Sequence, residues 1–591
     1  MRIRLALLAL ALLAAPSWAQ QVQPEEVVLD NGMKFLLLPR TAQPNSVSCG
    51  WVAKVGSVNE RPGITGISHF FEHMMFKGTR TIGTSDSTKD AELNQAQHAA
   101  RNRLRALVLS VQYPRWRSGE LDDPWDPKHD TDEMKKIRAE MAALVEQQRK
   151  VTVKDEFDSV YTQLGASGMN AFTSQDLTFY FISVPSNKLE LWTWMESDRL
   201  SDHVFREFYS ERDVVHEERR LRTESTPTGI FEEQFEAMFW QSSPYNWPVI
   251  GWPTDLNSYT AEQAEDYFKT WYRPNNLCGV IVGDFDKAAA KSLIKRYFGR
   301  LPKGEPTPPV VTLEQPQKGE QRMAAECDAA PQVEVRYHSV PFGHPDEAPV
   351  EVLAELMNGQ TGRLYKALIE GKQVATDASV RQDSRKYGGA FAFSGECKGD
   401  ATPQQVEDAW YEELRRLQEE EIPERELQKV KNRVLADSFR RLESNFYLMM
   451  QLGYYEALGG WQYINDSPKA LLAVTAADVK RVAKLYFGAT NRSVATFTRK
   501  ASAGGDAAPA EDAEVAALPA HLRAMAKQAL SELAEADDPE QLQAELAQLE
   551  GQAGAVPAEV KPLLQLILRR AKARLAELQK TQTTPPDKEG K

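Results

Sequence analysis

Residues 66–78 read GISHFFEHMMFKG and place His69, Glu72 and His73 in the order His-x-x-Glu-His. No proline interrupts the stretch and glycine stands at both ends, which predicts a short helix. On a helix, His69 and His73 are four residues apart and share a face. Such a pair can supply two imidazole ligands to a tetrahedral zinc ion. Glu72 would lie beside the metal without binding it and could take a proton from a water that zinc activates.

The residues around this motif strengthen the metal interpretation. A histidine pair on a helix can also be an ordinary surface or core feature, so the motif alone leaves the question open. The helix is largely apolar, because it also carries Phe70, Phe71, Met74, Met75 and Phe76. A buried helix must satisfy its polar groups, and a bound metal ion would do so.

Composition excludes some classes of protein. The chain has 591 residues, of which 42% are hydrophobic and 26% charged, and its formal net charge is −13. This composition is that of a globular protein with several domains. The negative charge argues against a nucleic-acid binder, and no run of lysine and arginine contradicts that reading.

The first 19 residues predict a signal peptide. Arg2 and Arg4 precede an apolar segment over 5–15, and residues 17–19 form a small-x-small cleavage site. An uncleaved anchor is the alternative. No later stretch is long and apolar enough to cross a bilayer, so we expect an exported protein, periplasmic or secreted, without stable membrane insertion. Four scattered cysteines leave both buried thiols and long-range disulfides open.

The pattern of elements predicts an α+β chain with an internal duplication. Strands and helices alternate in both halves, and the segments 475–487 and 491–497 parallel 260–272 and 276–285. The second half lacks the His-x-x-Glu-His order. The predicted parts are a signal peptide (1–19), an N-terminal domain (20–305) with a helical insertion (87–152), a linker (306–318), a C-terminal domain (319–500), and a flexible linker with a helical extension (501–591).

A second helix offers the ligand that the first one lacks. Residues 205–223 predict a charged helix on which Glu211 and Glu218, seven residues apart, share a face. An acidic residue on such a helix is usually part of a solvated salt bridge. Two histidines and a water leave one protein ligand missing, however, and a carboxylate from this helix would complete a His₂Glu catalytic site.

Three signals in this order resemble the M16 (pitrilysin-like) metallopeptidases, over roughly residues 24–500. The signals are the motif at 69–73, the strand pattern Asn170-Ala171-x-Thr173-x-x-Asp176-x-Thr178-x-Tyr180, and the helix pattern from Glu211 to Glu218. The resemblance implies two homologous α/β-roll domains, each a mixed sheet packed with helices, which together form a half-clamshell. The chain resembles the short members of the family. The insertion at 87–152 lengthens the interval between the His-x-x-Glu-His motif and Glu218.

The resemblance also implies roles for particular residues. His69, His73 and Glu218 match the ligands of one zinc ion per chain, and Glu72 matches the general base. Glu211 matches an acid next to the ligands. One strand matches the edge along which the substrate lies in extended form, and it contains Asn170, Ala171 and Thr173. A peptide would then be recognised by strand addition. Arg381 and Tyr387, in the second half, are further candidates for substrate binding.

We therefore expect a zinc endopeptidase that cleaves extended or unfolded peptides and works as a homodimer, or as a heterodimer with an M16 paralogue. The alternative is a non-catalytic subunit or scaffold of the same fold. The complete set of His69, Glu72, His73 and Glu218 argues against the alternative, because a subunit without chemistry does not need all four.

Overall fold

The computed structural model describes residues 21–500, residues 561–583 and scattered positions between 513 and 549. The chain divides into two compact units, residues 1–500 and 501–591. The signal peptide predicted over 1–19 lies outside the described residues. Among the residues that are described, no helix is both long and apolar enough to cross a membrane.

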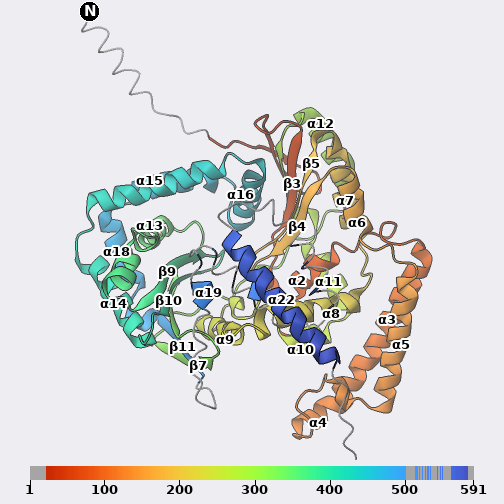
Figure 1. Ribbon diagram of the computed structural model, residues 1–591. Helices are drawn as coiled ribbons and strands as arrows, with labels where there is room; N and C mark the ends of the chain where they lie inside the picture. The colour runs from red at the N-terminus through yellow and green to blue at the C-terminus, as the bar shows by residue number, and fades with distance from the viewer. Residues whose placement is uncertain are drawn as a thin grey trace, which may run out of the picture. The chain divides into compact units, whose positions relative to one another are not determined.

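A six-stranded mixed sheet forms the first half of the larger unit (Figure 1), in the order β1-β2-β6-β3-β5-β4. Its strands are β1 (Glu25–Val28), β2 (Lys34–Pro39), β3 (Ser46–Ala53), β4 (Ser167–Thr173), β5 (Thr178–Pro185) and β6 (Leu277–Gly283). Gly32 lies in the turn between β1 and β2 with a φ of 88°, which glycine adopts without strain. Strands β2 and β6 are parallel and the other neighbours are antiparallel. Strand β4 ends the sheet.

A five-stranded sheet in the second half repeats this topology, in the order β7-β11-β8-β10-β9. Its strands are β7 (Gln321–Cys327), β8 (Gln332–Ser339), β9 (Ala375–Ser384), β10 (Gly389–Cys397) and β11 (Arg492–Arg499). Strands β7 and β11 are parallel and the rest antiparallel, as in the series β2-β6-β3-β5-β4. The predicted α+β fold with two homologous domains is therefore confirmed, and β9 is the counterpart of the edge strand β4.

Helices cover both sheets. In the first half they are α2 (Ile67–Met74), α6 (Glu156–Gln163), α7 (Leu189–Ser201), α8 (Phe208–Arg219), α9 (Gly229–Phe239), α10 (Pro253–Ser258), α11 (Ala261–Trp271) and α12 (Lys287–Tyr297). In the second half they are α13 (Glu347–Met357), α14 (Pro403–Glu419), α15 (Glu424–Arg441), α16 (Asn445–Leu458), α17 (Tyr463–Ala473) and α18 (Ala476–Tyr486). Residues 365–371 form a π-helical turn. Residues 302–320 carry neither helix nor strand.

The insertion is a helical hairpin, as its sequence pattern predicts. Helices α3 (Ser87–Leu107) and α5 (Asp132–Arg149) lie side by side, with the short helix α4 (Tyr113–Arg117) between them in the chain (Figure 1). Leu104, Met134 and Trp125 contribute to a small apolar core of the hairpin's own. Buried Arg206 of the body donates to Asp90 of α3 at 2.9 Å, which ties the hairpin to the body.

Helix α16, which the sequence did not predict, joins the two halves. It packs on β3 and β6 of the first sheet and buries Leu448, Met449 and Leu452 in a cluster with Val52 and Val280. Because this cluster draws on both halves, the two homologous domains share an apolar core.

All four cysteines are buried free thiols, which answers a question that the sequence left open. In the smaller unit, the described residues include the helix α22 (Lys561–Thr583). Most of the other helix predicted in the extension, over 518–550, lies outside the described residues.

Candidate metal centre

The helix that carries the motif begins at a cap supplied from outside it. Gly66 precedes α2 with a φ of 85° and has no side chain with which to cap the helix. The carboxylate of Glu60 accepts hydrogen bonds from the backbone nitrogens of Gly66 and Ser68, both at 2.7 Å. This satisfies two of the donors that a helix N-terminus leaves free. Residues 67–71 are buried, so the start of α2 is fixed against the core.

The structure brings together the side chains of His69, His73 and Glu218. One ligand atom from each lies within 4.8 Å of the other two. The Nε2 atom of His69 is 3.6 Å from Oε1 of Glu218, and Nε2 of His73 is 3.3 Å from Oε2 of the same carboxylate. His69 and His73, four residues apart on α2, share one face of that helix. This face meets Glu218 of α8.

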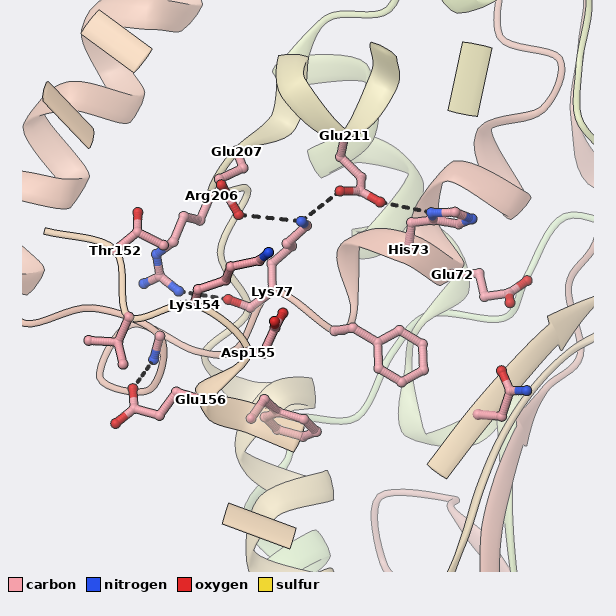
Figure 2. A pocket seen from close by; sticks show the side chains of 15 residues that line it. Glu72, His73, Lys77, Thr152, Lys154, Asp155, Glu156, Arg206, Glu207 and Glu211 are labelled. Carbon is pink, nitrogen blue, oxygen red and sulfur yellow. Dashed lines mark hydrogen bonds and ion pairs between the residues drawn. The ribbon is translucent and has the colours of Figure 1, made fainter. Parts of the chain in front are cut away.

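Glu211 and Lys77 orient the second histidine. The Nδ1 atom of His73 lies 2.8 Å from Oε1 of Glu211, whose other oxygen is 2.6 Å from Nζ of Lys77. Lys77 also contacts Glu207 at 3.3 Å, as Figure 2 shows. A proton on Nδ1 that is donated to Glu211 leaves the lone pair of Nε2 directed at Glu218. This is how the carboxylate behind a metal-binding histidine fixes the ring and its tautomer.

Glu72 lies beside the cluster and is held by the edge strand. The hydroxyl of Thr173, at the end of β4, donates to Oε2 of Glu72 at 2.6 Å. Burial raises the pKa of Glu72 above its ordinary value, although the hydrogen bond from Thr173 works in the opposite direction. A buried carboxylate with a raised pKa is a stronger base than one in water, which suits a proton acceptor.

The charges of the cluster fit a divalent cation. Burial, followed by the neighbouring His73, lowers the pKa of His69 to about 4. Burial opposes protonation of His73 too, but its contacts with Glu211 and Glu218 raise its pKa to about 9. The carboxylates of Glu211 and Glu218 therefore favour a positive charge at His73, which a bound cation would supply in place of a proton. Arg222 also contacts Glu218 at 2.5 Å.

Two nitrogens and one carboxylate oxygen are the donor set of many catalytic zinc sites. The Nδ1 atom of His69 is buried without a hydrogen-bond partner in the described part of the chain. The Nε2 atoms of both histidines face the carboxylate of Glu218, so these residues fit zinc.

Two cavities meet at the cluster. One, of about 680 Å³, is lined by His69, Glu72, His73 and Glu218 together with Asn170, Ala171 and Thr173 of the edge strand. The other, of about 350 Å³, shares Glu72, His73 and Asn170, and its wall includes Phe76 and Phe157 as well as residues 152–156, where the insertion returns to the body (Figure 2).

The two remaining candidates lie elsewhere. Arg381 lines a separate cavity of about 390 Å³ in the second half, beside the edge strand β9. The backbone nitrogen of Tyr387 donates to the hydroxyl of Tyr245 at 3.1 Å, in the turn between β9 and β10. Neither residue lines either cavity at the metal cluster.

Sequence reasoning missed Lys77 and Arg222. Lys77 stands four residues after His73, which it supports, and Arg222 stands four residues after Glu218, which it contacts. Helical spacing could therefore have indicated both.

Comparisons with known proteins identify the fold. A family model described as "Insulinase (Peptidase family M16)" matches residues 36–114, and one described as "Peptidase M16 inactive domain" matches residues 258–434. The zinc protease PqqE of Helicobacter pylori is 24% identical over 490 residues, which cover 81% of this chain and 94% of that protein.

Solved structures agree. "The crystal structure of a protease from Helicobacter pylori" has a TM-score of 0.66 at 23% identity and covers 80% of this chain and 99% of that one. The periplasmic protease PqqL from Escherichia coli has a TM-score of 0.60 at 17% identity, over 81% of this chain and 48% of that one.

Fold and relatives together define a metalloprotease at the level of the family, since the relatives bear the name zinc protease. Models of the M16 peptidase family match both halves of this chain, which fits a short member of that family.

Proposed function

We propose that this protein is a zinc-dependent endopeptidase that hydrolyses extended or unfolded peptides. The observation that carries the proposal is the arrangement in one cavity of a His₂Glu donor set, a half-buried carboxylate and the edge strand of the described sheet. His69, His73 and Glu218 would hold one zinc ion per chain. When bound, zinc would lower the pKa of a water molecule and polarise a peptide carbonyl.

Each catalytic step left to the protein has a residue in place. Glu72, adjacent to the ligands, takes the proton of the attacking water and returns it to the leaving amine. The hydroxyl of Thr173 keeps its carboxylate aimed into the cavity. Glu211 and Lys77 hold the ring of His73 while charge at the site changes.

The substrate would add to the sheet as a strand. Strand β4 pairs with β5 on one side and ends the sheet on the other, so its outer edge can bond a peptide backbone. Asn170 and Ala171 lie on this strand and line the cavity. A folded protein has few segments free to pair in this way, whereas an unfolded chain has many. The neighbouring cavity, between Phe76 and Phe157, would receive one substrate side chain.

The leader segment supports export, and we propose that the protein acts in the periplasm or outside the cell. We also propose that it pairs with a second copy or with an M16 paralogue, which would close a chamber around the substrate. Light scattering of the full mature chain, alone and mixed with a co-encoded paralogue, tests the pairing. A monomeric mass in both samples would contradict it.

Metal content and turnover test the function together. Purified wild-type protein should hold about one zinc per chain by mass spectrometry of the metal. His73→Ala should lose it, while His129→Ala should keep it, because the ring of His129 pairs with Asp122 within the insertion. Glu72→Gln should keep zinc and lose ~10²–10⁴-fold in peptide hydrolysis.

Three outcomes would count against the proposal. Absence of metal from the wild type would favour a non-catalytic scaffold of the same fold. Unchanged turnover by Glu72→Gln would remove Glu72 from the mechanism. Cleavage of a folded protein as rapid as that of its unfolded form would contradict recognition by strand addition.

A further inference from the structure

The turn that follows the edge strand β4 is held by both halves of the larger unit. On the side of the first half, the backbone nitrogens of Ser57 and Val58 donate to the carbonyls of Ser174 at 3.3 Å and Gln175 at 2.9 Å. The next residue is Asp176, whose side chain is buried among residues of both halves. A buried carboxylate must be hydrogen-bonded to be tolerated.

Asp176 meets this requirement by joining the two halves. Its Oδ1 accepts from the hydroxyl of Tyr245 at 2.7 Å, and its Oδ2 accepts from the backbone nitrogen of Lys386 at 3.0 Å. The hydroxyl of Tyr245 in turn accepts from the backbone nitrogen of Tyr387 at 3.1 Å. Lys386 and Tyr387 form the turn between β9 and β10, so a closed set of three hydrogen bonds spans the halves.

The turn between β9 and β10 is itself anchored. Arg385, next to Lys386 and buried, donates to Glu236 of α9 at 2.9 Å and to Asp383 at 2.8 Å. Its guanidinium lies over the ring of Tyr245, 5.0 Å from the centroid. A charged, hydrogen-bonded arginine stacked on an aromatic ring restricts both groups. The second half therefore presents the nitrogens of Lys386 and Tyr387 from a fixed position.

Thr173, which donates to Glu72, stands three residues before Asp176. We infer that Asp176 and Tyr245 are positioning residues, through which the second half fixes the end of β4 and hence the hydroxyl of Thr173 beside Glu72. This inference rests on the proposed function. It gives the motif-free half an indirect part in catalysis, because the backbone nitrogens of Lys386 and Tyr387 hold Asp176 and Tyr245. Neither of these two side chains lines the cavity at the metal cluster, and both act through the strand.

Tyr245→Phe tests the inference, since it deletes one oxygen atom and two of the three hydrogen bonds. Tyr486→Phe is the matched control, because the hydroxyl of Tyr486 donates to Asp346 at 2.6 Å within the second half. Amide hydrogen exchange over residues 170–177 should be about tenfold faster in Tyr245→Phe and unchanged in Tyr486→Phe. With zinc content unchanged, kcat on an unfolded peptide should fall about tenfold or more in Tyr245→Phe only.

The outcomes separate the two claims. Wild-type exchange over 170–177 in a folded Tyr245→Phe variant would overturn the inference. So would faster exchange with wild-type kcat, because the contacts would then be structural only. A wild type without peptidase activity would contradict the proposed function, and the exchange comparison would still decide whether Asp176 and Tyr245 fix the strand. Should Tyr245→Phe not fold, Asp176→Ala, which removes both acceptor oxygens, takes the same measurements with the same expected direction.

Discussion

Among single residues, Glu211 should govern how tightly the cluster holds a metal ion, although it is not one of the three candidate ligands. Its carboxylate accepts from His73 and pairs with Lys77, which holds the pKa of Glu211 down at about 2, against the effect of burial. Glu211→Gln removes the charge that fixes the tautomer of His73. We expect the zinc affinity to fall ~10–100-fold, measured by competition with a chelator.

Glu207→Gln is the control for that change, because Glu207 contacts Lys77 but not the histidine. Its zinc affinity should equal that of the wild type. If both variants bound zinc equally well, the ring of His73 would be held by packing and not by Glu211.

Phe76 sets the size of the side chain that the smaller cavity accepts. It is partly buried, and its ring faces the same cavity as the buried Phe157. Phe76→Ala should reduce kcat/KM for peptides with a large apolar side chain next to the scissile bond by ~10–100-fold, since a lost apolar contact has about that effect. Cleavage profiling of a peptide mixture measures it. Phe439→Ala, at an exposed position on α15, should leave the profile unchanged.

At the scale of elements, the metal-bearing helix α2 depends on a buried cap. Burial, the largest influence, raises the pKa of Glu60 to about 8, although the backbone nitrogens that it caps favour its charged form. The folded protein then binds a proton that the unfolded chain releases near pH 4.5. The contribution of this bound proton to the free energy of unfolding is full below that pH and is lost as pH rises toward 8.

Glu60→Gln should therefore remove part of the pH dependence of the free energy of unfolding. The wild type should lose stability relative to this variant between about pH 4.5 and pH 8, by a few kcal/mol at most, since one pKa unit corresponds to ~1.4 kcal/mol. Urea unfolding at four pH values across this window measures the difference. A constant difference would show that the carboxylate of Glu60 keeps its ordinary pKa in the fold.

The elements also show which parts of the structure could be predicted from the sequence. Flanking glycines and the absence of proline predicted α2, and helical patterns predicted the insertion, because these signals are local. Parallel segments of sequence predicted the duplication. Helix α16 was not predicted. Apolar residues lie on all faces of α16, and they join an apolar core only through contact with the other half. The bond between Asp176 and Tyr245 joins residues 69 positions apart, which no local pattern records.

For the candidate site, the residue types at 69, 72, 73 and 218 were sufficient to propose a cluster, and the structure brings them together. The count of ligands left one missing after α2, the charged helix at 205–223 offered Glu211 and Glu218, and the resemblance to the M16 metallopeptidases pointed to Glu218. The sequence could not indicate that Glu60 caps α2, because its acceptor role depends on a turn that places it against Gly66.

At the scale of the whole molecule, the shared core makes the two halves one folding unit, and Gly453 on α16 tests this. A Cβ atom at Gly453 would lie 2.4 Å from the ring of Phe179 on β5, closer than packed atoms approach. Gly453→Ala should lower the melting temperature by the equivalent of ~1–3 kcal/mol, as expected for overpacking, although alanine favours a helix over glycine by ~1 kcal/mol.

Gly488→Ala supplies the comparison, because a Cβ atom at that position meets no other atom within 4 Å. Calorimetry of the full chain should give an unchanged main transition for Gly488→Ala and a single, lowered one for Gly453→Ala, since Gly453 belongs to the second half and Phe179 to the first. Two separated transitions would mean that the halves unfold independently. In that event the second half could not hold β4 through Asp176 at temperatures where only the first half remained folded.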